Sequence, residues 1–243
     1  MFVETNGIKL YCEQTGRGPG LVLLHGNGED HTLFDGALVR RFAARYRVVA
    51  VDSRDHGRSD RVRTLRYEDM AEDVAGLIAA LSLTRPALLG FSDGGIVGLL
   101  LASRYPALVS KLVVIGGNTR PDGLRLWFRA SARFLYAAKR DEKLRLMLTQ
   151  PHISRAALGA IRAPTLVLAG SRDIIRTAHT RALAAAIPGS TLRILPGETH
   201  DSYVRRPEAL LAATADFLEL DAGAAETAQE IKQEIKHETE KEK

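Results

Sequence analysis

Leu88-Leu89-Gly90-Phe91-Ser92-Asp93-Gly94-Gly95-Ile96-Val97-Gly98 is the stretch of this sequence that decides the fold. An apolar run ends in the pattern Gly-x-Ser-x-Gly, and a second apolar run with small residues follows directly. This pattern predicts a buried strand, a tight turn with Ser92 at its apex, and a helix. Gly90 and Gly94 lack a Cβ atom, so strand and helix can approach closely on either side of the serine. The hydroxyl then projects beside a helix N-terminus, where developing negative charge is favoured.

The same pattern also occurs in surface turns that hold a serine between two glycines, and alone it decides little. The context separates the two interpretations, because a strand precedes the turn and a helix follows it. A serine placed in this way can attack a carbonyl carbon, provided that a base and an acid follow it in the chain.

The composition sets the broad class of the protein. The chain has 243 residues, 45% of them hydrophobic and 26% charged, which suits one α/β domain with a sizeable core. The formal net charge is +5; residues 221–243 hold seven acids and four lysines, so the rest carries 30 basic and 22 acidic residues, or +8. These cations are scattered with little aromatic interleaving. We therefore expect a solvated basic surface and no nucleic-acid partner.

The cysteine count and the apolar runs bear on the cellular compartment. Cys12 is the only cysteine, which rules out an intrachain disulfide and a thiol-rich metal site. The first residues, Met1-Phe2-Val3-Glu4-Thr5, lack the basic and apolar regions of a signal peptide. No apolar run approaches the ~18 residues of a membrane span. We expect a cytoplasmic protein with no membrane partner, and the sequence does not determine its oligomeric state.

Strand-like and helix-like segments alternate along most of the chain. The first two expected strands meet at Asn6-Gly7, a strong hairpin signal. The remaining alternation predicts the α/β class, with a doubly wound, mostly parallel sheet. The expected strands are 2–5, 8–13, 21–24, 47–51, 87–91, 111–115, 165–169 and 191–195, and the expected helices are 32–44, 67–81, 94–104, 177–187 and 207–220.

Residues 118–163 interrupt this alternation between two core strands. They contain two helix-like stretches, 123–139 and 141–148, and we expect them to form a small helical lid over a pocket. Five residues of the first stretch share helical spacing, and such a face is more often core than a substrate wall. These residues are Trp127, Ser131, Phe134, Leu135 and Ala138.

The last 23 residues differ in kind from the rest. Their only large apolar residues are Ile231 and Ile235, which cannot build a core. We expect one domain over residues 1–220, including the lid, and a charged tail over 221–243 that is frayed or disordered. A docking helix that uses the two isoleucines is the alternative.

Two residues lie where a nucleophilic serine needs its partners. Asp173 lies four residues beyond the strand ending at Ala169, and His200 lies five residues beyond the strand ending at Leu195. In this type of sheet the nucleophile, the acid and the histidine follow in that order, each near the C-terminal end of a strand.

The chain resembles an α/β-hydrolase-fold enzyme over about residues 2–220. The resemblance implies that Ser92 is the nucleophile, His200 the general base and then acid, and Asp173 the orienting acid. It also implies an oxyanion hole made by the backbone N–H groups of Asn27 and Asp93, and no metal or organic cofactor. The segments that carry it are His25-Gly26-Asn27-Gly28, Asp52 through Ser59, Gly90-Phe91-Ser92-Asp93-Gly94-Gly95, Gly170-Ser171-Arg172-Asp173 and Gly197-Glu198-Thr199-His200.

Other roles are open to the residues of this set. His200 in a solvated loop and Asp173 as a helix N-cap are the simplest alternatives, and capping is compatible with catalysis. Asp122 is a fallback acid, because it follows the strand 111–115. Asp201 adjoins His200 and cannot easily turn back on its ring.

The polar loops before Ser92 contain residues with expected structural roles. We expect His25 and His56 to brace their loops. Asp55 stands where similar hydrolases usually have glycine, and aspartate is among the few residues that tolerate positive φ.

Taken together, these residues predict a serine hydrolase acting through an acyl-enzyme on an ester, thioester or amide of a small carboxylic acid. Serine at position 92 argues against a haloalkane dehalogenase, which has a carboxylate there. A carbon–carbon bond hydrolase of the same fold is one alternative. A non-catalytic receptor that retains a hydrolase pocket is the other, and both leave the small-molecule ligand unidentified.

Overall fold

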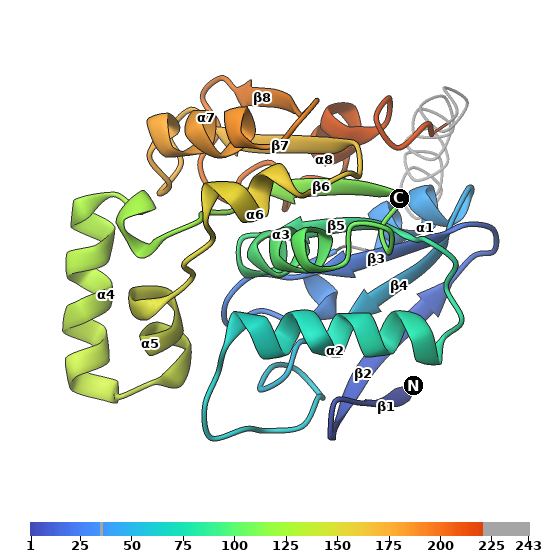
Figure 1. Ribbon diagram of the computed structural model, residues 1–243, viewed down its shortest axis with the longest axis horizontal. Coiled ribbons are helices and arrows are strands. Elements are labelled where there is room, and N and C mark those ends of the chain that lie inside the picture. Colours follow the sequence, from blue (N-terminus) through green and yellow to red (C-terminus); the bar gives the residue numbers. More distant parts are fainter. Residues whose placement is uncertain (35, 221–243) are drawn as a thin grey trace, which may run out of the picture.

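The computed structural model describes residues 1–34 and 36–220, so the predicted tail over 221–243 lies outside the described residues. Within them, strands form one sheet in the order β1-β2-β4-β3-β5-β6-β7-β8 (Figure 1). Strands β3 to β8 run parallel, whereas β1 and β2 are antiparallel additions at one edge. The predicted fold class is confirmed. The strands are β1 (Phe2–Thr5), β2 (Ile8–Thr15), β3 (Gly20–Leu24), β4 (Arg47–Val51), β5 (Ala87–Phe91), β6 (Lys111–Ile115), β7 (Thr165–Gly170) and β8 (Thr191–Leu195).

Helices cover both faces of the sheet. Successive side chains of a strand point to opposite faces, and in β3 Val22 and Leu24 join one core cluster while Leu21 and Leu23 join the other. Helices α2, α3, α6 and α7 contribute to the first cluster, and α1 and α8 to the second. The helices are α1 (Gly36–Ala43), α2 (Tyr67–Ala80), α3 (Asp93–Arg104), α4 (Leu126–Lys139), α5 (Glu142–Thr149), α6 (Arg155–Gly159), α7 (Thr177–Ala186) and α8 (Pro207–Thr214), with 3₁₀ turns η1 (His31–Leu33) and η2 (Pro121–Gly123).

The hairpin between β1 and β2 forms at the predicted turn. Asn6 and Gly7 have φ values of 48° and 76°, the left-handed conformation that a two-residue hairpin requires. Thr5 pairs with Ile8 across the turn. Strand β2 is longer than predicted, because its end pairs with β4 as far as Thr15 and Val48.

The turn between β5 and α3 has the predicted close approach. A Cβ atom on Gly90 would lie 2.2 Å from the carbonyl oxygen of Gly94, and one on Gly94 would lie 2.2 Å from that of Leu24. Ser92 adopts φ 52° and ψ −111°, which is strained for a residue with a side chain. The Ser92 N–H donates to the carbonyl oxygen of Ile115 at 2.7 Å. The sheet therefore holds the serine in place from the neighbouring strand β6.

The helix predictions depart most from the structure at three places. The expected helix 32–44 divides into η1 and α1, because the Asp30 carboxylate accepts from the Thr32 N–H and caps a separate turn. The expected helix 207–220 ends at Thr214, and Glu219 beyond it has a φ of 54°. Helix α6 was not predicted, since five residues are too few for a periodic apolar pattern.

Helices α4, α5 and α6 all lie in the chain between β6 and β7, where the sequence predicted an insertion. Figure 1 shows α4 and α5 side by side beyond one end of the sheet, with α4 outermost. In the described part of the chain, none of the helices combines the length and apolarity needed to cross a bilayer.

A methyl group at residue 94 tests the close approach. Gly94→Ala is expected to lower the free energy of unfolding by about 2 kcal/mol or more, because backbone atoms cannot yield to the new Cβ as a flexible side chain can. Urea unfolding measures this change. Gly159→Ala is the matched control, since a Cβ there meets no atom within 4 Å, and it should be neutral or slightly stabilising. Equal stabilities of the two variants would contradict the packing described here.

Candidate active site

Ser92, His200 and Asp173 lie together beyond the C-terminal ends of their strands. His200 Nε2 is 3.0 Å from Ser92 Oγ, and His200 Nδ1 is 2.7 Å from Asp173 Oδ1. When Nδ1 donates to the carboxylate, Nε2 is left with a lone pair directed at the serine hydroxyl. The structure thus brings together the three residues that were predicted to act together. Their catalytic roles stay a prediction.

Hydrogen bonds to backbone groups hold Asp173, the acid of the Ser92–His200–Asp173 relay, in place. Asp173 is 1% exposed, and its Oδ1 also accepts the N–H of Ile175 at 2.8 Å. Arg125 Nε donates to the Asp173 carbonyl oxygen at 2.6 Å, so a residue next to α4 helps to hold the loop that carries the acid. The Asp173 carboxylate therefore has one preferred orientation, with Oδ1 toward His200.

Close packing fixes the histidine ring. The Phe91 and His200 ring centroids are 4.9 Å apart. On the other side, a Cβ atom on Gly116 would lie 2.7 Å from His200 Cε1, and Gly116 has a φ of +59°. A residue with a side chain at 116 would displace the ring, so glycine is required there both by space and by backbone conformation.

The two predicted oxyanion-hole residues are tied to each other by side chains. Asn27 Nδ2 donates to Asp93 Oδ2 at 2.9 Å, and the Tyr67 hydroxyl donates to Asp93 Oδ1 at 2.7 Å. Among residues 1–34 and 36–220, no protein acceptor is recorded for the backbone N–H of Asn27 or of Asp93. Both N–H groups are therefore available to an incoming oxyanion, although their role stays a prediction.

Burial dominates the electrostatics of this network. It raises the pKa of the Asp93 carboxyl, while the hydrogen bonds from Tyr67 and Asn27 lower it. Burial and the neighbouring Asp93 also raise the pKa of the Tyr67 hydroxyl, which keeps it a donor. Tyr67 was not among the predicted site residues, because nothing in its local pattern shows that the first residue of α2 reaches Asp93.

His25 and His56 brace their loops, as predicted. His25 Nδ1 lies 2.7 Å from the carbonyl oxygen of Gly26, and its Nε2 accepts the N–H of Ser53 at 3.0 Å. Burial lowers the pKa of His25 to about 4, so the ring is neutral near pH 7. His56 Nδ1 lies 2.9 Å from the carbonyl oxygen of Arg54. Asp55, in the same loop, has a φ of 62°, a conformation that aspartate tolerates.

A cavity of about 180 Å³ opens beside Ser92 and His200. Part of its wall comes from the insertion between β6 and β7, so these helices shape the space above the serine. Arg205 lies at the cavity and pairs with Glu29 at 2.6 Å and with Asp201 at 2.9 Å, which makes one side of it charged. The apolar lining residues are Phe91, Leu124, Phe128, Met147, Ile174 and Ile175.

One fallback assignment is wrong. Asp122 is exposed and lies 3.2 Å from Arg120 Nε, and the structure records no contact between Asp122 and His200, whose ring nitrogen contacts Asp173. Asp201 pairs with Arg205 and does not fold back on His200, as expected.

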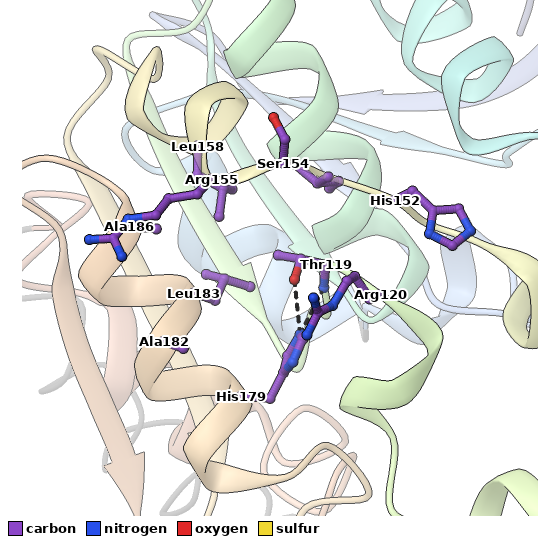
Figure 2. Close-up of a pocket in the computed structure, with 11 residues that line it drawn as sticks. Thr119, Arg120, His152, Ser154, Arg155, Leu158, His179, Ala182, Leu183 and Ala186 are labelled. Atoms are coloured by element: carbon purple, nitrogen blue, oxygen red, sulfur yellow. Dashed lines mark hydrogen bonds between the residues drawn. The ribbon is translucent and has the colours of Figure 1, made fainter.

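A larger cavity of about 370 Å³ lies elsewhere, between α6, α7 and the segment after β6 (Figure 2). In it, His179 Nε2 accepts the N–H of Thr119 at 3.0 Å, so this histidine is held by backbone and faces no serine hydroxyl. Ser154, also in its wall, accepts the N–H of Ala157 and caps α6. The Thr119 hydroxyl also lies 3.1 Å from His179 Nε2, but that nitrogen already accepts the Thr119 N–H, and within the described residues no hydrogen bond joins the His179 ring to a carboxylate. The smaller cavity, where His200 contacts both Ser92 and the buried Asp173, is therefore the candidate active site.

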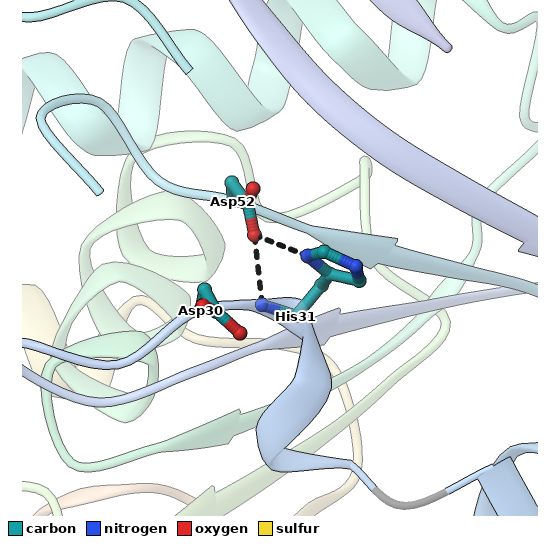
Figure 3. Close-up of side chains that lie close together, drawn as sticks. All are labelled: Asp30, His31 and Asp52. Atoms are coloured by element: carbon teal, nitrogen blue, oxygen red, sulfur yellow. Dashed lines mark hydrogen bonds and ion pairs between the residues drawn. The ribbon is translucent and has the colours of Figure 1, made fainter. Parts of the chain in front are cut away.

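One cluster has the residue types of a metal site. Asp30, His31 and Asp52 offer ligand atoms within 4.8 Å of one another, and Figure 3 shows the Asp52 carboxylate turned toward the His31 ring. Asp52 Oδ1 accepts from His31 N–H and lies 2.6 Å from Nδ1, and Asp52 Oδ2 accepts from Arg58 N–H. Asp30 Oδ1 accepts from the N–H and hydroxyl of Thr32. These contacts occupy the ligand atoms and indicate a structural brace.

Known proteins resemble the chain over most of its length. A family model described as alpha/beta hydrolase fold matches residues 19–144. Serine hydrolase BPHL of Homo sapiens is 30% identical over 250 residues, which covers 89% of this chain and 85% of that protein. A thermophilic esterase from Thermogutta terrifontis has a TM-score of 0.74 at 25% identity, covering 90% and 98% of the two chains. An esterase from Exiguobacterium antarcticum has a TM-score of 0.79 at 23% identity, covering 90% and 98%.

The low pKa of His25 predicts acid sensitivity. Above pH 6.5 the ring is neutral in both states, but below it the unfolded chain binds a proton that folded His25 binds only near pH 4. As the pH falls from 6.5 to about 4, the free energy of unfolding should therefore decrease by about 3 kcal/mol through His25 alone. Urea unfolding across this range should show a shallower pH slope for His25→Asn. The exposed His152→Asn is the control, and equal slopes in all three proteins would contradict the assignment.

Proposed function

The chain belongs to the α/β-hydrolase fold family and is a hydrolase of this fold; from that premise we propose that it is a serine hydrolase acting through an acyl-enzyme. The observation that carries the proposal is the relay Ser92–His200–Asp173, with consecutive contacts of 3.0 and 2.7 Å. A serine hydroxyl is a weak nucleophile until a base accepts its proton, and His200 Nε2 is within reach to do so.

The proposed reaction has two halves. Ser92 Oγ attacks the carbonyl carbon while His200 takes the hydroxyl proton, and the resulting oxyanion accepts hydrogen bonds from the N–H groups of Asn27 and Asp93. The imidazolium, stabilised by Asp173, then gives that proton to the leaving alcohol, thiol or amine. In the second half His200 takes a proton from a water molecule, which attacks the carbonyl carbon of the acyl-enzyme. His200 then returns the proton to Ser92 Oγ as the bond between the serine and the acyl group breaks, and the carboxylic acid is released.

The cavity favours a small acyl group. Its volume of about 180 Å³ is below the range of about 300–1,000 Å³ that is typical of pockets for drug-sized ligands. The wall made by Phe128, Met147 and Ile174 is apolar, which suits a short aliphatic or small aromatic acyl chain. We infer an ester, thioester or amide of a small carboxylic acid as substrate, and an ester as the first class to test. The proposal retains the expected cytoplasmic location and needs no cofactor.

A fluorophosphonate probe tests the nucleophile directly. We expect stoichiometric labelling of the full-length protein at Ser92, located by peptide mapping, because the probe reacts with an activated serine. Ser92→Ala should abolish labelling and lower kcat for a p-nitrophenyl acetate substrate by about 10³-fold or more. Ser154→Ala, which alters a serine in the other cavity, is the matched control and should behave like wild type.

The outcomes separate the alternatives. An initial burst of p-nitrophenol equal to the enzyme concentration would support the acyl-enzyme, provided that deacylation is the slower half. Labelling at Ser92 together with turnover only of a carbon–carbon bond substrate would replace the ester assignment. No labelling and no ester turnover by the folded protein would contradict the proposal and favour a ligand receptor.

Tyr67→Phe tests whether Asp93 supports the oxyanion hole. Without the hydroxyl, Asp93 Oδ1 loses its 2.7 Å hydrogen bond, and the N–H groups near it lose part of their support. We expect kcat/KM to fall about tenfold and the free energy of unfolding to fall by about 1–3 kcal/mol. Tyr46→Phe is the control, because its buried hydroxyl donates to the carbonyl oxygen of Leu218 at 2.6 Å and does not line the cavity. Equal kcat/KM values in the two variants would contradict a role for Tyr67 in positioning.

A further inference from the structure

Helix α4 turns an apolar face to solvent. Leu126, Trp127, Phe134 and Leu135 are 74%, 61%, 75% and 42% exposed. At 100° per residue they share one half of the helix with exposed small residues, including Ala130, while the buried Ala132 lies on the opposite half. Figure 1 shows this helix at the outer end of the molecule, with α5 on its inner side. An exposed cluster of this kind on a monomer commonly marks an interaction surface.

This finding corrects the sequence-based expectation for the helix. The face that includes Trp127, Phe134 and Leu135 was predicted to be core, and the structure places it in solvent. The helical spacing of these apolar residues was predicted correctly, but the face they form lies in solvent and not in the core. Within the described residues the inner side of α4 is covered by α5, and Phe128, which is only partly exposed there, faces the cavity beside Ser92.

The charges on α4 and its two caps have one sign, and the nearest acids in the chain are Asp122 before them and Asp141 after them. Five cations and no acidic residue occur between residues 123 and 140, namely Arg125, Arg129, Arg133, Lys139 and Arg140. Arg133 and Lys139 are exposed and lie at opposite edges of the apolar half. Their long side chains can follow the apolar surface and place the charge beyond it.

We propose that α4 docks on the surface of an anionic lipid bilayer. A helix with aromatic and leucine residues on one side and flanking cations lies at the boundary between headgroups and acyl chains, and its cations attract anionic headgroups. Tryptophan is enriched at that boundary because its ring is apolar with one polar N–H. The sequence led us to expect no membrane partner because it has no membrane-spanning run, but a helix that binds at the bilayer surface does not need to span the bilayer.

A second copy of the chain fits this face less well. In a two-fold symmetric contact the same surface meets itself, so the exposed cations of α4 would lie against the same cations of the partner's α4, and the helix itself carries no carboxylate. An anionic bilayer, in contrast, supplies both the apolar layer and the opposite charge. The charge pattern therefore favours a lipid surface over self-association.

The docking face adjoins the candidate active site. Phe128 on α4 lines the cavity beside Ser92, whereas Trp127 and Phe134 point to solvent from the same helix. A bilayer against the outer face would thus lie one helix away from the cavity. This position brings the cavity close to compounds dissolved in the membrane, although docking itself does not depend on the proposed hydrolase activity.

The native Trp127 reports on docking, because it is the only tryptophan in the chain. The full-length protein is mixed with vesicles of phosphatidylcholine, or of phosphatidylcholine with phosphatidylglycerol. We expect a blue shift of Trp127 emission and co-sedimentation with the anionic vesicles, and both should weaken as salt screens the cations.

Two variants keep the fluorescent probe and test each half of the proposal. The double variant Leu126→Ser with Phe134→Ser is expected to lower the vesicle partition coefficient at least tenfold, because two exposed apolar groups are lost. Arg133→Gln with Lys139→Gln should reduce binding to anionic vesicles alone. Phe2→Ser is the matched control, since Phe2 is 52% exposed at the far edge of the sheet, and it should bind like wild type.

Three results would overturn the proposal. No shift and no sedimentation with anionic vesicles overturn it, and so does equal binding to both vesicle types. Lipid-independent dimerisation that the double variant abolishes would make a second copy the occupant and would also overturn it. Hydrolysis of a soluble ester should be unchanged in the double variant, because neither residue lines the cavity. Failure of docking can therefore be distinguished from failure of the proposed function.

Discussion

The close backbone approach at Gly90 and Gly94 is the constraint on which the rest of this structure depends. It allows Ser92 to sit between a strand and a helix in a conformation that costs about 1–3 kcal/mol. Hydrogen bonds from both sides offset that strain: Ser92 N–H reaches Ile115 in β6, and Gly94 N–H reaches the carbonyl oxygen of His25. The turn that carries Ser92 is thus hydrogen-bonded to β6 and to the residue after β3, the two strands that flank β5. The sheet therefore fixes the orientation of the serine.

The same arrangement explains why buried polar groups gather around the turn. Parallel strands end at one edge, so the loops after β3, β4, β5, β7 and β8 converge there, and several carry histidine or aspartate. Each buried polar group needs a partner, and the partners form continuous chains, from Tyr67 through Asp93 to Asn27 and from Ser92 through His200 to Asp173. Loss of one member removes a hydrogen bond from its neighbour, as the loss of the Tyr67 hydroxyl would for the buried Asp93.

The sequence predicted what depends on local pattern and chain order. Strands such as Arg47–Val51 and Lys111–Ile115 have the predicted ends, and the three relay residues were found because each follows a strand at the appropriate distance. Contacts between distant segments could not be predicted. Tyr67 meets Asp93 across 26 residues, and the cavity wall depends on how the insertion packs. Periodicity identified the apolar face of α4, but only the arrangement of its neighbours decides whether such a face is core or surface.

Helix α4 therefore has two surfaces with different physical roles. Its inner side supplies Phe128 to the cavity, and the residue before it, Arg125, holds the carbonyl oxygen of Asp173. Its outer side carries exposed Trp127 and Phe134 among cations. The contacts on the two sides of the helix therefore constrain it independently, the inner ones through the cavity wall and the loop that carries Asp173. One helix and its N-cap thus supply both a wall of the cavity and a hydrogen bond to the loop of Asp173, whereas Ser92 is held by the sheet.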